Sequence, residues 1–122
     1  MDTGTGYDEL LTADLLSEVR FVHEYVQFVF WPLTLSVYAS INATTGGRSL
    51  QQSDLGYYDV ICRLIGQKIV QIERVDNVEM TLRFTNGAVL GISLVPTAHS
   101  GPEIAMLSGE GGAPLMVEQY GE

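Results

Sequence analysis

The sequence predicts an α+β fold: a twisted antiparallel sheet, or a partial barrel of hairpins, with one main helix over residues 54–65 and a short N-terminal helix. Three observations predict it. Several stretches alternate apolar and polar residues, which is typical of half-buried strands. The stretch after residue 54 instead repeats apolar residues at helical spacing. Asn86-Gly87 separates two alternating runs, and this dipeptide is a strong hairpin signal because both residues tolerate positive φ.

The chain of 122 residues is long enough for one hydrophobic core and too short for two. We expect one domain over residues 7–120, with frayed termini at residues 1–6 and 121–122. The content of 46% hydrophobic and 17% charged residues is typical of a folded globular protein. A single cysteine cannot form an internal disulfide, and no signal peptide is visible at the start, so we expect a cytoplasmic protein.

The first half of the chain predicts a short helix followed by three strands. Leucines between residues 8 and 17 are spaced for an amphipathic helix. Alternation then predicts strands over residues 19–23, 25–30 and 33–39. Trp31-Pro32 forms the corner between the last two, because proline cannot donate to a sheet ladder. The polar, glycine-bearing stretch 42–52 is expected to be a loop between the halves.

The main helix is expected to begin at Ser53 or Asp54, whose short side chains accept hydrogen bonds from the free amides of a first helical turn. Gly66 suits the left-handed residue that follows a helix. The apolar stripe expected to face the core comprises Leu55, Tyr58, Ile61, Cys62 and Ile65. Cys62 is therefore expected to be a small buried residue rather than a nucleophile.

Two long strands and a final hairpin follow this helix. The long strands are predicted over residues 69–75 and 78–85. After Asn86-Gly87, the return strand continues the inward face with Leu90, Ile92 and Leu94. The last hairpin is predicted over residues 103–108 and 114–120.

The order of a helix followed by alternating strands occurs twice. Residues 15–18 match residues 64–67, and the inward-facing rows of the strands also match. These rows are Val26, Phe28 and Phe30 with Met80, Leu82 and Phe84, and Leu35 and Val37 with Leu90 and Ile92. Two interpretations stay open: an internal duplication, or a shared alternating pattern that arose independently.

The formal net charge of −9 comes from the two ends of the chain. Neither residues 1–19 nor residues 84–122 contain a lysine or arginine, and both segments are acidic. Nucleic acids and anionic membranes bind cationic patches, so we expect neither as a partner. We expect a basic protein partner, because an acidic surface steers basic proteins towards it. The alternative is that the acidity only keeps a small domain soluble.

No catalytic, metal or cofactor motif occurs in the sequence. His23, His99 and Glu103 are residue types found in zinc sites, but no closely spaced pair of ligands accompanies them. We therefore expect no metal, no cofactor and no enzyme activity. The binding candidates are Trp31, Tyr57 and Tyr58, because exposed tryptophan and tyrosine are frequent binding anchors, although they also serve as lids over a core edge.

Three segments of the second half carry a family resemblance. They are Leu64 to Ile69, Leu82 to Leu90 and Pro102 to Gly109. Their order resembles a group of small uncharacterised bacterial proteins, some of which are similar to immunity proteins encoded beside secreted toxins. The resemblance covers residues 54–118. It adds Glu103 to the binding candidates, where the group commonly has a Tyr-Glu pair and this chain has Pro102-Glu103.

Two functions are consistent with these observations. The first is a non-catalytic, immunity-like protein-interaction module that binds a basic partner. The second is a small-molecule-binding domain with an apolar pocket between helix and sheet, lined by Tyr57, Tyr58, Phe28 and Phe84. A homodimer through a sheet edge is a further expectation, because edge strands leave backbone groups unpaired.

Overall fold

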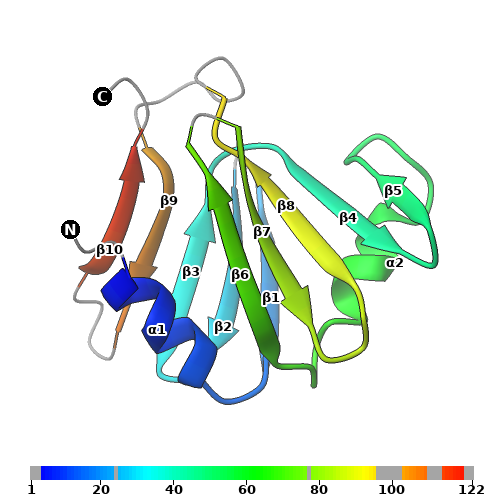
Figure 1. Ribbon diagram of the computed structural model, residues 1–122. Coiled ribbons are helices and arrows are strands. Elements are labelled where there is room, and N and C mark those ends of the chain that lie inside the picture. Colours follow the sequence, from blue (N-terminus) through cyan, green and yellow to red (C-terminus); the bar gives the residue numbers. More distant parts are fainter. Residues whose placement is uncertain (1–3, 24, 77, 96–102, 110–113, 120–122) are drawn as a thin grey trace.

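The computed structural model describes residues 4–23, 25–76, 78–95, 103–109 and 114–119 (Figure 1). In this part of the chain it contains two short helices and ten strands. The elements are α1 (Gly4–Thr12), β1 (Glu18–Val22), β2 (Tyr25–Phe30), β3 (Leu33–Val37), β4 (Ile41–Thr45), β5 (Arg48–Leu50), α2 (Tyr57–Cys62), β6 (Ile69–Val75), β7 (Glu79–Phe84), β8 (Val89–Ser93), β9 (Glu103–Ser108) and β10 (Pro114–Gln119).

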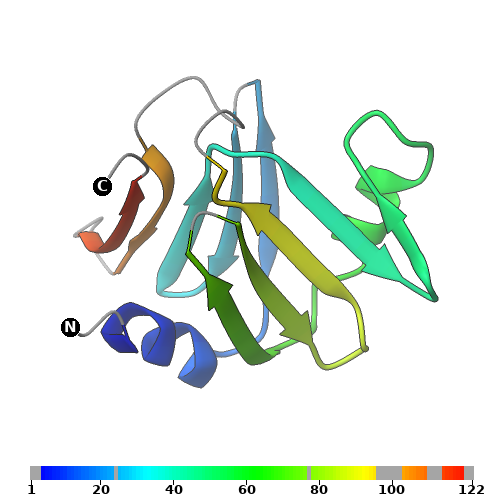
Figure 2. The same ribbon diagram turned by 45° about the horizontal axis from the view of Figure 1, so that its top comes forward.

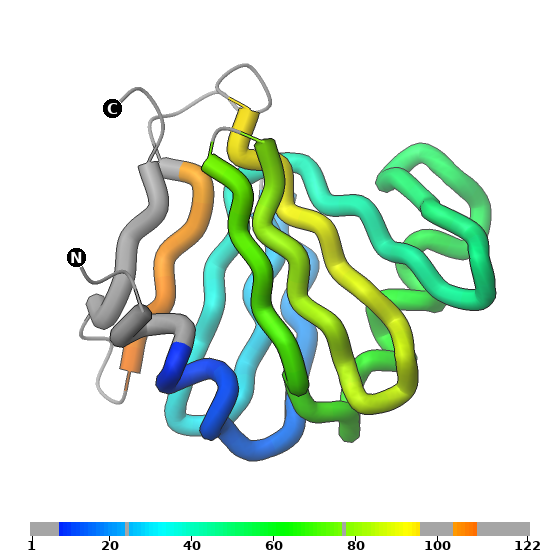
Figure 3. Tube along the Cα trace, in the orientation of Figure 1, coloured from blue at the N-terminus to red at the C-terminus, as the bar shows by residue number. Residues whose placement is uncertain are grey.

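The strands form two antiparallel five-stranded sheets, layered one over the other (Figures 1 and 2). The strand order is β1-β2-β3-β9-β10 in the first sheet and β5-β4-β8-β7-β6 in the second. The chain crosses from the first sheet to the second between β3 and β4 (Figure 3). The expected antiparallel strands are therefore present. In the described part of the chain they form two sheets and no closed barrel, rather than the one sheet or partial barrel expected.

Each sheet combines three consecutive strands from one half of the chain with a hairpin from the other half. β9 pairs with β3 in the first sheet as β4 pairs with β8 in the second. The registers also agree. The opposed pairs are Phe28–Leu35 and Val26–Val37 in the first sheet, and Leu82–Leu90 and Met80–Ile92 in the second. The correspondence of these rows, predicted from the alternating pattern, is therefore confirmed.

The registers also correspond where each half contributes a hairpin to the sheet of the other half. The opposed pairs there are Leu35–Leu107 and Val37–Ala105 in the first sheet, and Leu90–Ala43 and Ile92–Ile41 in the second. The segments after the two helices also meet. Leu16 donates its N–H to the Gln67 carbonyl and accepts the N–H of Gly66, both at 2.8 Å. The two halves thus share one pairing scheme and contact each other directly after their helices.

The helix expected over residues 54–65 is shorter and begins later. α2 has six residues and α1 has nine, so the expectation of one main helix is wrong. Gly56 precedes α2 with a φ of 94°, a left-handed conformation that an α-helix cannot continue through. Neither Ser53 nor Asp54 is therefore the N-cap. The Asp54 carboxylate instead accepts the N–H of Gln51 at 2.8 Å.

The buried face of α2 and the turn after it differs from the expected stripe. Three residues at helical spacing are buried, namely Tyr57, Ile61 and Leu64. The stripe members that are exposed are Leu55, Tyr58, Cys62 and Ile65. Both sets have helical spacing, so periodicity alone does not choose between them. Packing of α2 against β4 decides the outcome, and it leaves Cys62 on the surface rather than in the core.

α1 lies earlier than the helix expected over residues 8–17. It includes residues 4–6 of the segment expected to be frayed, and two glycines with low helix propensity hide its start in the sequence. Leu10 and Leu16 are buried, and α1 packs against β6 and β10 (Figure 2). Just beyond the helix, the Asp14 carboxylate accepts the N–H of Leu15 at 2.8 Å.

Residues 42–52 are not the expected loop, because β4 and β5 form a hairpin there. Gly46 and Gly47 have φ values of 56° and 80°, the left-handed conformations that a two-residue type I′ turn requires. Ala43 and Leu50 lie opposite each other and are both buried. The sequence signal for this turn is the Gly46-Gly47 dipeptide after Thr44 and Thr45. The polar residues on the outward face of the hairpin made its strands resemble a loop.

The hairpin at Asn86-Gly87 joins β7 and β8 as expected, but its turn has one residue more than a type I′ turn. Phe84 donates its N–H to the Ala88 carbonyl, and Gly87 donates to the Phe84 carbonyl, both at 2.9 Å. The loop therefore contains three residues, and its last residue, Gly87, has a φ of 88°. A three-residue loop that ends in a left-handed glycine is the next most common hairpin connection after the two-residue loop.

One hydrophobic core fills the space between the sheets. Inward side chains of β2, β3 and β9 meet those of β4, β7 and β8, and the two helices lie at opposite sides of the layers (Figure 1). The largest fully buried side chains are Phe28, Phe30, Phe84, Leu10, Leu16, Leu35, Ile61, Leu64, Met80, Leu82, Leu90 and Ile92.

Candidate functional site

The candidate site is an open cleft of about 290 Å³ at the end of the first sheet. The β1–β2 turn, the β3–β4 connection and α2 surround it. Its aromatic lining consists of Phe21, Tyr25, Tyr38, Tyr57 and Tyr58, and His23 stands among them. We call this cavity the aromatic cleft. It gathers four of the six tyrosines of the chain from three separate segments.

One wall of the aromatic cleft is a row of rings in edge-to-face contact. The Phe21 ring of β1 lies 4.9 Å from the Tyr58 ring of α2, with the planes at 77°. Tyr58 in turn lies 5.0 Å from Tyr57, with the planes at 88°. Such contacts hold aromatic side chains in defined orientations. Tyr57 is buried, whereas Phe21 and Tyr58 are 40% and 45% exposed, so the row runs from the core to the surface.

A second ring pair comes from the outward rows of β2 and β3. Tyr25 and Tyr38 lie just beyond the opposed pair Val26–Val37, and their ring centroids are 5.3 Å apart. The Tyr38 N–H donates to the Ile104 carbonyl at 2.8 Å, which ties the end of this strand to β9. Strand pairing therefore places this ring pair, and both side chains are half-buried.

The second half of the chain shows that strand pairing does not require these aromatic residues. Because the two halves share one register, each cleft residue on β1, β2 and β3 has an equivalent on β6, β7 and β8. The equivalent pairs are Phe21 and Arg74, Tyr25 and Glu79, and Tyr38 and Ser93. The same backbone thus accommodates arginine, glutamate and serine. The aromatic lining belongs to one half only, while the core rows recur in both.

A second and larger cleft adjoins the aromatic cleft. Its volume is about 660 Å³, and its polar lining consists of Ser40, Asn42, Gln51, Gln52, Ser53 and Ser93. We call it the amide cleft. Ser40, Ile41 and Gln52 line both cavities. The Gln52 Nε2 group donates to the Tyr58 hydroxyl at 3.1 Å, so one side chain bridges the two clefts.

The described lining of both clefts contains no lysine, arginine, aspartate or glutamate. Burial, together with a smaller effect of the neighbouring Tyr58, raises the pKa of Tyr57 to about 12. The Tyr57 hydroxyl is therefore protonated at neutral pH. In the part of the chain that the structure describes, His23 forms no hydrogen bond to a carboxylate. The described lining thus offers aromatic faces, uncharged polar groups and the His23 imidazole.

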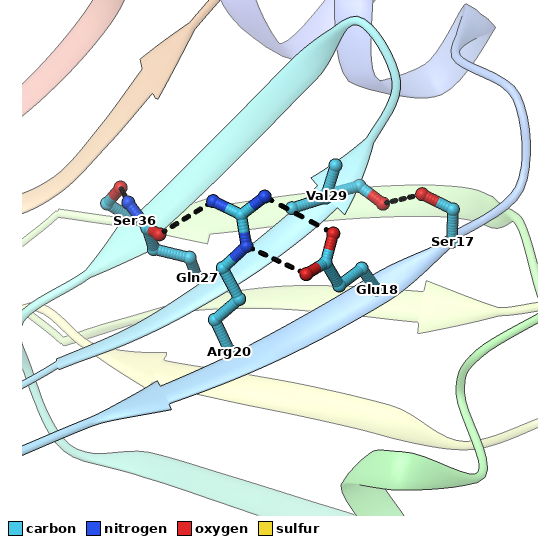
Figure 4. A network of polar contacts seen from close by, with 6 residues as sticks. All are labelled: Ser17, Glu18, Arg20, Gln27, Val29 and Ser36. Atoms are coloured by element: carbon cyan, nitrogen blue, oxygen red, sulfur yellow. Dashed lines mark hydrogen bonds and ion pairs between the residues drawn. The ribbon is translucent and has the colours of Figure 1, made fainter.

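A polar network covers the outward face of the first sheet beside the aromatic cleft (Figure 4). Arg20 donates to both carboxylate oxygens of Glu18, at 2.9 and 3.2 Å, and this pairing lowers the pKa of Glu18. Arg20 also reaches Gln27, which donates to the buried Ser36 hydroxyl at 3.1 Å. Arg20, which precedes Phe21 in β1, is therefore already paired with the Glu18 carboxylate.

The structure brings together two of the four binding candidates predicted from the sequence. Tyr57 and Tyr58 both line the aromatic cleft. Trp31 follows the opposite end of β2, in the β2–β3 turn, where it is 70% exposed and lines neither cleft. Glu103 begins β9, and its side chain lies outside the described part of the chain.

The apolar pocket expected between helix and sheet is not one of the two clefts. Phe28 and Phe84 are packed in the core at 0% and 1% exposure, and neither lines a cavity with Tyr57 and Tyr58. The residues that the sequence did not single out are Phe21, Tyr25, Tyr38 and Gln52. Each has an unremarkable local pattern, and only the strand register shows that they meet.

Among the described residues, no group of three or more His, Cys, Asp or Glu side chains is placed to hold a metal ion. His99, one member of the zinc set considered above, lies outside those residues. Neither described helix is long and apolar enough to cross a membrane. Comparison of the chain with protein families, with characterised proteins and with solved structures finds no match.

Proposed function

We propose that this protein is a non-catalytic interaction module that captures a basic segment of a partner protein in the aromatic cleft. The observation that carries the proposal is the gathering of Phe21 and four tyrosines around one open cleft. Aromatic faces attract lysine and arginine through their π electrons. Tyrosine is also among the residues that most often dominate protein interfaces.

The charge of the chain supports a basic partner over an acidic one. The net charge of −9 attracts cations over a range longer than direct contact. No described lysine or arginine lines the cleft to repel an incoming basic side chain. Asp54 lies two residues beyond Gln52 on the rim, and its exposed side chain adds negative charge there.

The family resemblance of residues 54–118 supports the same class of function. Immunity proteins act by binding another protein, and we propose an immunity-like role in the cytoplasm on that basis. The shared register of the two halves supports an internal duplication. In this proposal the core rows were retained in both halves, and the first half acquired the aromatic lining.

A selection from a library of short random peptides tests the proposal. The immobilised protein is expected to enrich peptides that contain lysine or arginine, and their binding is expected to weaken as salt is added. Tyr38→Ser introduces the residue found at the equivalent position of the second half, so it removes an aromatic face that the fold does not need. Trp31→Ala is the matched control outside the cleft. Enrichment without basic residues, or binding lost in Trp31→Ala alone, would contradict the proposal.

A further inference from the structure

The aromatic cleft and the amide cleft form one groove. They share Ser40, Ile41 and Gln52, and the Gln52–Tyr58 hydrogen bond lies at their junction. The aromatic part is the smaller, at about 290 Å³, and the amide part is the larger, at about 660 Å³. When the side chain of a lysine or arginine fills the aromatic cleft, the main chain of that residue therefore lies beside the amide cleft.

The polar lining of the amide cleft matches the chemistry of a peptide main chain. Asn42, Gln51 and Gln52 each carry a carbonyl that accepts and an amino group that donates hydrogen bonds. A peptide unit likewise carries one N–H donor and one C=O acceptor. Side-chain amides therefore bind main-chain amides in complementary pairs, and the serine hydroxyls both donate and accept.

The loop that supplies Gln51, Gln52 and Ser53 is held in place before any ligand binds. Asp54 donates its N–H to the Gln51 carbonyl, and the Asp54 carboxylate accepts the Gln51 N–H, both at 2.8 Å. The Gln52 side chain is fixed by Tyr58. A ligand consequently meets a loop whose main chain and Gln52 side chain are already hydrogen-bonded, which lowers the entropic cost of binding.

Two carboxylates lie near the amide cleft. Asp54 follows the loop that supplies Gln51, Gln52 and Ser53. The Glu79 carboxylate lies over Gly91, in the space that a Cβ atom would occupy, and Gly91 lies opposite Asn42 of the cleft. Glu79 also lies opposite Ser93, which lines the cleft. The groove thus has a neutral floor and acidic flanks, a combination that favours a cationic ligand over an acidic one.

We infer that the groove binds an extended peptide segment, with a lysine or arginine side chain in the aromatic cleft and the adjoining main chain hydrogen-bonded to Asn42, Gln51 and Gln52. This inference rests on the proposed function and adds to it the form of the ligand. Residues next to the basic side chain are uncharged or basic, because aspartate or glutamate there would face Asp54 and Glu79.

The test compares two probes by calorimetric titration. Propylguanidinium, which has the arginine side chain without any peptide unit, occupies the aromatic cleft alone, whereas a short peptide with a central arginine flanked by serine and glycine reaches both clefts. The peptide is expected to bind more tightly. The double variant Asn42→Ala/Gln51→Ala is expected to weaken binding of the peptide about tenfold, the effect of losing one or two hydrogen bonds, and to leave binding of propylguanidinium unchanged.

Controls separate this inference from the proposed function. Gln71→Ala removes an amide on β6 that is bonded to Glu73, away from the groove, and is expected to change neither affinity. If Tyr38→Ser weakens both probes but Asn42→Ala/Gln51→Ala weakens neither, the extended-peptide inference is wrong and the proposed function stands. If Tyr38→Ser affects neither probe, the proposed function itself fails.

A second measurement does not depend on variants that fold. In the nuclear magnetic resonance spectrum of the unmodified protein, the side-chain amide signals of Asn42, Gln51 and Gln52 are expected to shift with the peptide and not with propylguanidinium. Shifts produced instead by a neutral glucose oligomer, with none from the peptide, would overturn the inference and assign the groove to a carbohydrate.

Discussion

Phe21 of β1 and Tyr58 of α2 are in edge-to-face contact, with ring centroids 4.9 Å apart. The first residue belongs to the first half of the chain and the second to the other half, so the wall of the aromatic cleft forms only when both halves have packed together. The contact therefore couples the binding site to the assembly of the two sheets.

The Phe21–Tyr58 contact is expected to contribute a coupling free energy of about 0.5–1.5 kcal/mol to stability, the usual value for an aromatic pair. A double-mutant cycle with Phe21→Ala and Tyr58→Ala, followed by urea denaturation, measures it. The Tyr25–Tyr38 pair provides a comparison within a single half. Additive effects of Phe21→Ala and Tyr58→Ala would show that the rings are adjacent without being coupled.

Gly66→Ala is expected to lower the free energy of unfolding by about 1–2 kcal/mol, because its φ of 95° is left-handed and a Cβ atom is disfavoured there. A Cβ at this position meets no other atom within 4 Å, so the cost is conformational rather than steric. Thermal denaturation checks the change. Gly66→Asn, which tolerates left-handed φ better, is the control and is expected to lose less.

Gly91→Ala is expected to cost less than about 1 kcal/mol, because the added methyl group collides only with the flexible end of the Glu79 side chain, which can move aside. The cost is expected to disappear when Glu79→Ala is already present. Urea denaturation of the two single variants and the double variant measures this dependence. An equal cost in both backgrounds would mean that the backbone, rather than the carboxylate, opposes the methyl group.

Stability is expected to fall at high pH through Tyr57. Its pKa in the folded protein is raised to about 12 by burial, whereas an unfolded tyrosine titrates near about 10. Below the unfolded pKa both states hold the proton and stability is unaffected. As the pH rises from that value through the folded pKa, the unfolded state loses its proton first and is favoured. The difference in unfolding free energy between the original protein and Tyr57→Phe is expected to change only in this window.

Local patterns predicted most of the strands because alternation reflects which side chains face the core. β2 has the expected bounds, and the matched rows of Phe28 and Leu82 share one register. Local patterns were less informative where backbone conformation or packing decided the outcome. The left-handed Gly56 fixes the start of α2, and contact with β4 selects which helix face is buried.

The candidate site was only partly predictable from the sequence. Tyr57 and Tyr58 were recognisable as adjacent aromatic residues on a helix. Tyr25 and Tyr38 are thirteen positions apart, and their contact depends on the β2–β3 register rather than on any local motif. Comparison of the two halves supplies the missing signal, since the equivalent positions hold Glu79 and Ser93.

The most direct test of the aromatic cleft is the dissociation constant for an arginine-containing peptide, measured by calorimetry for the original protein, Tyr38→Ser and Trp31→Ala. Loss of one cation–π partner is expected to weaken binding by about 2- to 30-fold in Tyr38→Ser, and Trp31→Ala is expected to match the original protein. Equal affinity in the original protein and Tyr38→Ser, with loss in Trp31→Ala, would contradict the account and move the binding surface to the β2–β3 turn.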